Sequence, residues 1–134
     1  MRRLLSLLAV SATLVASGAL AAPTSCGAGL RPAKTAEIFF GRDDGDVVSD
    51  TDWRQFVEAE VLPRFPDRLA VASVYGQRRD PARHFAQEPS KAVLVVLTGA
   101  PNDDQKLDLV RNAYAARFHQ DSVLQLEPQA CVAF

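Results

Sequence analysis

Five polar side chains lie around one expected turn, and their types could bind an anion or move a proton. They are Tyr75, Gln77, Arg79, His84 and Glu88. A guanidinium can hold a carboxylate or phosphate through paired hydrogen bonds, and an imidazole beside a carboxylate or phenol can form an acid–base pair. The alternative is the solvated end of a hairpin, where polar cross-strand pairs face water. Because polar strand ends are common and sites are few per protein, we prefer this structural interpretation.

A second polar set lies where the first expected helix meets the next strand pair. Arg64 lies within the segment Pro-Arg-Phe-Pro, and it could pair with Glu88 to join helix and hairpin. Ser90 and Lys91 begin a strongly apolar run, and Lys91 could extend its ammonium group from the start of that strand to water. Ion pairs at such junctions are ordinary, so this set indicates a structural role.

Metal and cofactor motifs are absent from the sequence. The acidic segment 43–52 does not have the spacing of a calcium loop, and helix capping and solvation account for its aspartates. His84 and His119 are the only two histidines, without H-E-x-x-H or C-x-x-C. No G-x-S-x-G or glycine-rich phosphate loop is present either. We therefore expect neither a metal nor a cofactor.

The five polar side chains depend on a long β-hairpin, which the sequence predicts over Leu69–Thr98. Two apolar runs, 69–74 and 92–97, contain the β-branched and aromatic or aliphatic residues typical of strands. The segment 80–83 contains Asp-Pro, which opens a turn well and would form the tip.

The predicted turn also sets a register for the hairpin. With the turn centred on Pro-Ala, Arg79 would lie opposite His84. Because proline cannot donate a ladder hydrogen bond, we expect a bulge or edge position within residues 87–90. Alternation then puts four polar side chains on one face: Tyr75, Gln77, Arg79 and His84. Glu88 joins them if the bulge follows it.

Two helices and two further strands complete the predicted domain. A capping pattern at 49–52 begins the first helix, and another near Asn102 begins the second. Thr35–Gly41 and Ser122–Leu126 are predicted to be the first and the last strand. Apolar residues at helical spacing mark the buried faces of the helices: Trp53, Phe56, Val57 and Val61, then Leu107, Val110, Tyr114 and Phe118.

In chain order the predicted elements are strand, helix, strand, strand, helix, strand. This order predicts an α+β domain with the ferredoxin-like βαββαβ pattern. Its four-stranded antiparallel sheet would carry both helices on one face. The other face would be open and partly apolar, so we expect a second subunit, a terminal segment or a ligand to cover it. The tail 130–134 could supply this cover, and a dimer packed sheet to sheet is equally compatible.

The first residues have the pattern of a secretory signal peptide. Arg2 and Arg3 precede an uncharged apolar stretch that ends in small residues suited to cleavage after Ala21 or Ala22. We divide the chain into a signal peptide (1–21), a tether (22–34) and one domain (35–134). Cleavage would leave 13 basic and 16 acidic residues, a net charge near −3, and no stable membrane span. That balance argues against nucleic acid as a partner.

Cys26 and Cys131 are the two cysteines, one near each end of the expected mature chain. In an exported protein this pair predicts a disulfide. The competing interpretation is a lipoprotein acylated at Cys26, although Pro23 occupies a position where such sequences carry leucine. Either way the protein would be exported, to the periplasm or beyond, or anchored to the membrane by lipid.

The chain resembles a bacterial family known as domain of unknown function 3574. The resemblance rests on these segments: IFFG (38–41), Trp53 with Phe56, LPRFPDRL (62–69), GQRRD (76–80), EPSKAVLVVL (88–97), Tyr114, Phe118, QDSVL (120–124) and CVAF (131–134). Position 78, where the family pattern suggests an aromatic residue, holds arginine. The resemblance implies a small exported domain and supplies no activity.

These observations favour a non-enzymatic binding or interaction module of the cell envelope. Its partner would be a small molecule, an envelope protein or a second copy of the chain. The alternative is a small enzyme on the same scaffold, with His84 or Tyr75 moving a proton and Arg79 holding an anionic substrate.

Overall fold

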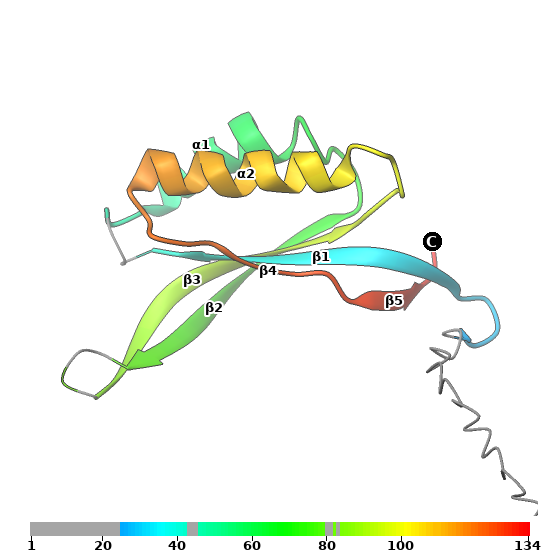
Figure 1. Ribbon diagram of the computed structural model, residues 1–134, viewed down its shortest axis with the longest axis horizontal. Coiled ribbons are helices and arrows are strands. Elements are labelled where there is room, and N and C mark those ends of the chain that lie inside the picture. The colour runs from blue at the N-terminus through cyan, green and yellow to red at the C-terminus, as the bar shows by residue number, and fades with distance from the viewer. Residues whose placement is uncertain (1–24, 43–45, 80–81, 83) are drawn as a thin grey trace, which may run out of the picture.

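The computed structural model describes residues 25–42, 46–79, 82 and 84–134 of the 134-residue chain (Figure 1). The predicted signal peptide therefore lies outside the described residues. The elements are β1 (Arg31–Gly41), α1 (Asp50–Phe56), η1 (Val57–Val61), β2 (Leu69–Arg79), β3 (Phe85–Val96), α2 (Asp103–Phe118), β4 (Leu124–Leu126) and β5 (Gln129–Val132).

The sheet has the strand order β2-β3-β1-β4, and each of these neighbours pairs antiparallel. Both helices lie on one face of this sheet, and no helix formed by the described residues lies on the other face (Figure 1). The predicted ferredoxin-like α+β fold is therefore confirmed.

The covered face of the sheet holds the core. Ile38 and Phe40 of β1 are at most 1% exposed, because alternate residues of the strand point toward the helices. The ring of Phe40 lies 4.7 Å from that of Tyr114 in α2 and 5.2 Å from that of Trp53 in α1. Edge-to-face and tilted contacts of this kind add to the burial of the rings themselves. The two predicted helical stripes are buried here, with Val57 only half-buried.

The first helix begins as predicted. The Asp52 amide donates to Ser49 Oγ at 3.1 Å, and the Ser49 amide donates to Asp52 Oδ2 at 3.3 Å. The Ser49 hydroxyl also donates to Asp52 Oδ2, and this bond together with the one from the Ser49 amide holds the pKa of the Asp52 carboxyl below its ordinary value. After Phe56 the helix widens into the π-helical turn η1, and it ends just before Pro63.

The hairpin of β2 and β3 is long and projects beyond the helices (Figure 1). Its register differs from the predicted one, because Arg79 pairs with Phe85 and not with His84. The predicted bulge is absent, since pairing continues without interruption from Leu69 to Arg79. Pro89 fits this ladder because it lies where β1 ends, and its carbonyl accepts a hydrogen bond from the Arg42 amide at 3.1 Å.

The first strand begins within the predicted tether, because a second stretch of chain pairs with it there. Residues 31–34 pair with β5, and β4 pairs with the same edge of β1 in the same register. Pro128 separates β4 from β5, and its carbonyl accepts a bond from the Thr35 amide at 3.1 Å. Pairing with this edge of β1 therefore continues on both sides of Pro128.

The predicted disulfide is present between Cys26 and Cys131, 105 residues apart in sequence. Cys131 pairs with Pro32 across the ladder of β1 and β5, so the bridge fixes the C-terminal tail to the start of β1. Cys26 is engaged in this bridge, which leaves no thiol for the alternative of acylation.

Candidate functional site

The five polar residues around the hairpin tip do not share one face. Tyr75, Gln77 and Arg79 alternate along β2 and therefore point to one side. Glu88 pairs with Gly76, so its side chain points to the opposite side from these three. The one-residue shift of register is the physical reason, because the predicted pairing of Arg79 with His84 would have placed Glu88 opposite Tyr75.

The hairpin residues on the first side are exposed. The Tyr75 side chain is 71% exposed, and the Arg79 guanidinium stacks on the ring of Phe85 at 4.9 Å from its centroid. His84 is also exposed. Four of the clefts among the described residues have volumes of about 230–390 Å³, and none of these four is lined by these hairpin residues.

Glu88 lies instead against the end of β1. A Cβ atom at position 41 would lie 2.5 Å from Glu88 Oε1, so the Glu88 carboxylate lies directly against the Gly41 backbone. The Tyr114 hydroxyl donates to the Gly41 carbonyl at 2.6 Å. Burial raises the pKa of Tyr114 to about 12, with the Glu88 charge adding to this and Arg42 opposing it. This arrangement ties the end of β1 to α2.

The second predicted set divides in two. Arg64 does not pair with Glu88: its guanidinium bonds Glu60, one turn earlier, at 2.9 Å. Lys91 does join the hairpin to α1, because its ammonium group lies 2.9 Å from Ser73 Oγ and 3.4 Å from Asp50 Oδ1. Ser90 is 8% exposed, and its hydroxyl donates to the Glu88 carbonyl at 3.3 Å. Arg64 pairs locally because η1 presents Glu60 within reach.

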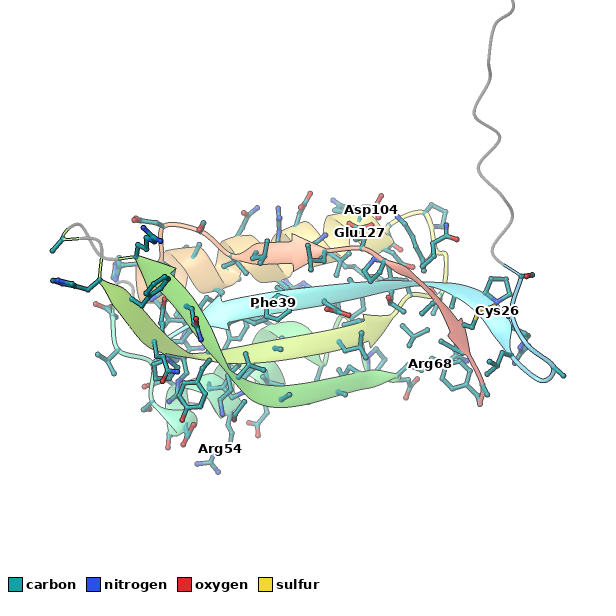
Figure 2. The ribbon with its side chains drawn as sticks, turned by 90° about the horizontal axis from the view of Figure 1, so that it is seen from below. Cys26, Phe39, Arg54, Arg68, Asp104 and Glu127 are labelled. Atoms are coloured by element: carbon teal, nitrogen blue, oxygen red, sulfur yellow. A yellow bond between two sulfur atoms is a disulfide. The ribbon has the colours of Figure 1, made fainter. Side chains whose placement is uncertain are left out.

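The open face of the sheet is apolar in its middle. Register places its side chains in two rows across the four strands. The first row is Leu126, Glu37, Leu94 and Ala70, and the second is Leu124, Phe39, Ala92 and Ala72. Figure 2 looks onto this face, with Phe39 near its middle.

The size of the side chains on this face changes from one edge to the other, from leucine on β4 to alanine on β2. At the β4 edge, Leu124 is 58% exposed and Leu126 is 47% exposed, so the two leucines form a ridge. At the β2 side, Ala70 and Ala72, with the neighbouring Ala92, form the floor of a hollow of about 290 Å³. We call these features the leucine ridge and the alanine hollow.

One end of the open face is different because the C-terminal tail lies there. A cleft of about 390 Å³ is bounded by the starts of β1 and β2, the end of β3 and the tail. Arg68 lies at this end, where β5 approaches β2 (Figure 2), and its guanidinium stacks over the Phe134 ring at 4.5 Å. We call this feature the tail cleft. The tail thus covers one end of the face, and the ridge and the hollow stay uncovered.

Two further clefts lie elsewhere. One, of about 230 Å³, lies between the loop before β2 and the start of α2, where Arg64, Asp103 and Lys106 are among its lining residues. The other, of about 270 Å³, lies beside α1 and η1 and is lined by Trp53 and Val71 among others. Neither cleft contains any of the five polar residues of the hairpin.

Sequence reasoning missed the ridge, the hollow and the tail cleft. The alternation of Leu124 and Leu126 beside Phe39 was a usable signal, because these residues share one face of two neighbouring strands. The placement of Arg31 and Arg68 in one cleft had no local signal, since it depends on the path of the tail.

Within the described residues, no helix is long and apolar enough to cross a membrane. No group of three or more histidine, cysteine, aspartate or glutamate side chains in that part of the chain is placed to hold a metal ion.

Comparison with known proteins gives a family and a fold. A family model described as "Protein of unknown function (DUF3574)" matches residues 35–134. No curated protein matches the chain.

Among solved structures, one similar fold is a phage SAM lyase in complex with S-methyl-5'-thioadenosine. It has 17% identity and a TM-score of 0.54, with 82% of this chain and 94% of that chain covered. The same phage enzyme in its apo state has 18% identity and a TM-score of 0.53, with 77% and 90% covered. CutA from Synechococcus elongatus has 14% identity and a TM-score of 0.46, with 73% and 84% covered. At such identities the similarity to the two lyase structures shows a shared fold alone.

Proposed function

Because this chain belongs to the family described as Protein of unknown function (DUF3574), we propose its function from its own surfaces. It is an exported, non-enzymatic interaction domain of the cell envelope. It works as a dimer of two copies that pack sheet to sheet. The observation that carries the proposal is the fit between the leucine ridge and the alanine hollow of the same face.

The fit follows from the two rows of the open face. A two-fold axis parallel to the strands would place the β4 edge of one copy over β2 of the other and keep each row in place. Leu126 of one copy then faces Ala70 of the other, and Leu124 faces Ala72. A ridge that meets a hollow is what an isologous interface requires, because one surface must complement itself. The natural twist of sheets packed face to face would rotate this alignment by about 30°.

The apolar character of the face supports the same partner. Leu94 is 40% exposed, and Leu124 and Leu126 are more exposed still. Burying an apolar side chain fully is worth about 1.5–3 kcal/mol, so finishing the burial of three half-exposed leucines per copy contributes several kcal/mol. Association itself costs at least about 4 kcal/mol, and a micromolar dissociation constant corresponds to about 8 kcal/mol of net binding free energy. A micromolar dimer, which we expect, therefore also needs the burial of Phe39 and of the remaining apolar residues of the two rows.

Glu37 is the one charged residue within the two rows, and its carboxylate forms no hydrogen bond or ion pair with any described residue. Burying its carboxylate between two sheets costs free energy. Glu37→Gln should therefore tighten the dimer. If the sheet faced solvent instead, the same substitution should not change the association of the chain.

Export rests on the pattern of residues 1–21 and is supported by the disulfide, since such bonds persist in oxidising compartments. A mass spectrum of the protein from the envelope fraction of its host tests this. Under denaturing, non-reducing conditions we expect a chain beginning at residue 22 or 23 that is two hydrogens lighter than the reduced form. An unprocessed chain, or an added diacylglyceryl group, contradicts the proposed form of export.

A small enzyme using Tyr75, Arg79, His84 and Glu88 gains no support from the fold. Glu88 points away from the face of Tyr75 and Arg79, and His84 is exposed outside the described clefts. A general acid–base pair needs two groups that reach one substrate atom, and this separation opposes that.

Sedimentation equilibrium tests the dimer with two matched leucines. Leu126 and Leu109 are 47% and 46% exposed, but Leu109 lies on α2, away from the open face. Leu126→Glu should weaken dimerisation at least about 100-fold, because it places a carboxylate in an apolar contact. Leu109→Glu should leave it unchanged. Equal effects of the two variants, or a wild-type monomer throughout the micromolar range, would overturn the proposal.

A further inference from the structure

We propose that the tail cleft is a binding site for an organic anion: one carboxylate or phosphate group attached to an apolar body. The site lies within a single chain and does not depend on the proposed dimer. Its lining combines three cationic side chains with an apolar wall, and none of its lining residues is acidic.

Two of the three cations are available to a ligand. Lys34 already pairs with Glu127 at 2.9 Å and with Asp104 at 3.4 Å. Arg31 and Arg68 form no ion pair with any described residue. In a chain whose formal net charge is −1, two arginines without carboxylate partners in one cleft form a local positive site.

The geometry of Arg68 suits it to hold an anion. Its backbone has a φ of 63°, a left-handed conformation that is uncommon for a residue with a side chain. The guanidinium stacks on the Phe134 ring, and this contact uses its flat face. The N–H groups along its edge remain available, and these bind a carboxylate or phosphate in paired hydrogen bonds.

The apolar part of the ligand has its own wall. Val96 and Leu97 at the end of β3 and Val132 and Phe134 in the tail line the same cleft. Inorganic phosphate would leave this wall without a contact, whereas an aromatic or aliphatic body would cover it.

The disulfide makes this site conditional on the redox state. Val132 and Phe134 belong to the tail that Cys131 ties to the start of β1. Reduction would release one wall of the cleft and the ring on which Arg68 stacks. Binding should therefore weaken in the reduced protein.

Calorimetric titration of the full disulfide-bonded chain tests the proposal, with phenyl phosphate, benzoate, dodecanoate and inorganic phosphate as probes. We expect the organic anions to bind at least about ten times more tightly than inorganic phosphate. If dodecanoate binds more tightly than phenyl phosphate and benzoate, the ligand is lipid-like. If the two aromatic anions bind more tightly than dodecanoate, the ligand is compact. Equal binding of inorganic phosphate would overturn the role of the apolar wall.

Variants then separate the site from general charge. Arg68→Gln should weaken binding at least about tenfold, and Phe134→Ala, an exposed position where folding is not at risk, should weaken it severalfold. The matched control is Arg54→Gln, an arginine on α1 away from the cleft (Figure 2). Equal losses for Arg68→Gln and Arg54→Gln, or no loss for Phe134→Ala, would contradict the assignment.

One further variant separates this proposal from the dimer. Leu126→Glu should keep the anion affinity of the wild type, because no residue of the cleft comes from a second copy. Loss of binding together with dimerisation would show a shared site and overturn the single-chain assignment. A wild-type monomer that still binds the organic anions would overturn the dimer alone.

Discussion

The two faces of the sheet are made by alternate residues of the same strands, yet they meet different surroundings. On β1, Ile38 and Phe40 are buried under the helices, while Glu37 and Phe39 point to the other side and are only half-buried. Both faces carry apolar residues in their middle. The covered face closes against helices of its own chain, whereas the open face has only the tail, at one end.

This difference separates the contacts that stabilise the folded chain from the contacts that are available to a second molecule. Contacts on the covered face form whenever the chain folds, because the helices are joined covalently to the strands. Contacts on the open face need a second molecule, so their energy depends on concentration. Substitutions on the two faces should therefore change different measurements.

The largest contrast is expected between two neighbouring phenylalanines. Phe40→Ala removes a ring at the centre of the aromatic cluster and should lower the free energy of unfolding by about 4 kcal/mol. Phe39→Ala should cost the isolated monomer at most about half as much, but it should abolish most dimerisation. Urea unfolding of dilute protein gives the first quantity, and sedimentation gives the second. Equal losses of stability would mean that the open face supports the fold as much as the core does.

The next largest effect concerns the tail that covers one end of the open face. Replacing Cys26 and Cys131 together by serine should lower the free energy of unfolding by about 3 kcal/mol, since native bridges in small domains contribute about 2–5 kcal/mol. Amide hydrogen exchange should become faster in residues 129–132, while β1 and β3 stay protected. Unchanged exchange in the tail would show that strand pairing alone holds it.

A smaller effect is expected where α2 is tied to the end of β1. Tyr114→Phe removes the bond to the Gly41 carbonyl and should cost about 1–2 kcal/mol. The pKa of Tyr114 is raised from 10.0 to about 12 by burial, so the folded state retains a proton that the unfolded state loses. This stability is fully present below pH 10 and is lost as the pH rises through 12. Urea unfolding between these values should show a decline that Tyr114→Phe reduces, with Tyr75→Phe as the exposed control.

The smallest effect is expected at the start of the helical layer. Ser49→Ala removes the cap of α1 and should cost about 1 kcal/mol. Its bonds lower the pKa of Asp52 below 3.8, so this stability is present above that value and is lost as the pH falls through the folded pKa. Unfolding curves at neutral and acidic pH should therefore converge for the wild type and the variant. A constant difference down to low pH would show that Asp52 plays no part.

The sequence predicted the covered face well because its pattern is local. Helical stripes such as Leu107 to Phe118 and the caps at Ser49 and Asn102 depend on neighbours within one turn, and they place the helices directly. The order of elements then leads to the fold, because few topologies fit it.

The hairpin register and the candidate sites were less predictable. A one-residue shift at the turn exchanges the two sides of a strand, and Pro89 suggested a bulge that the end of β1 makes unnecessary. Arg64 pairs with Glu60, four residues earlier in the sequence, and not with the distant Glu88. The tail cleft depends on a contact between the two ends of the domain, which no local pattern contains.

Exchanging the ridge with the hollow tests the central claim most directly. Sedimentation equilibrium is measured for the wild type, Ala72→Leu, Leu124→Ala and the double variant. Ala72→Leu fills the hollow and Leu124→Ala lowers the ridge, so each alone should weaken the dimer. In the double variant each new leucine meets the alanine of the other copy, and dimerisation should recover at least about tenfold over either single variant. If the loss of dimerisation free energy in the double variant equals the sum of the losses in the two single variants, a two-fold interface on the open face is contradicted.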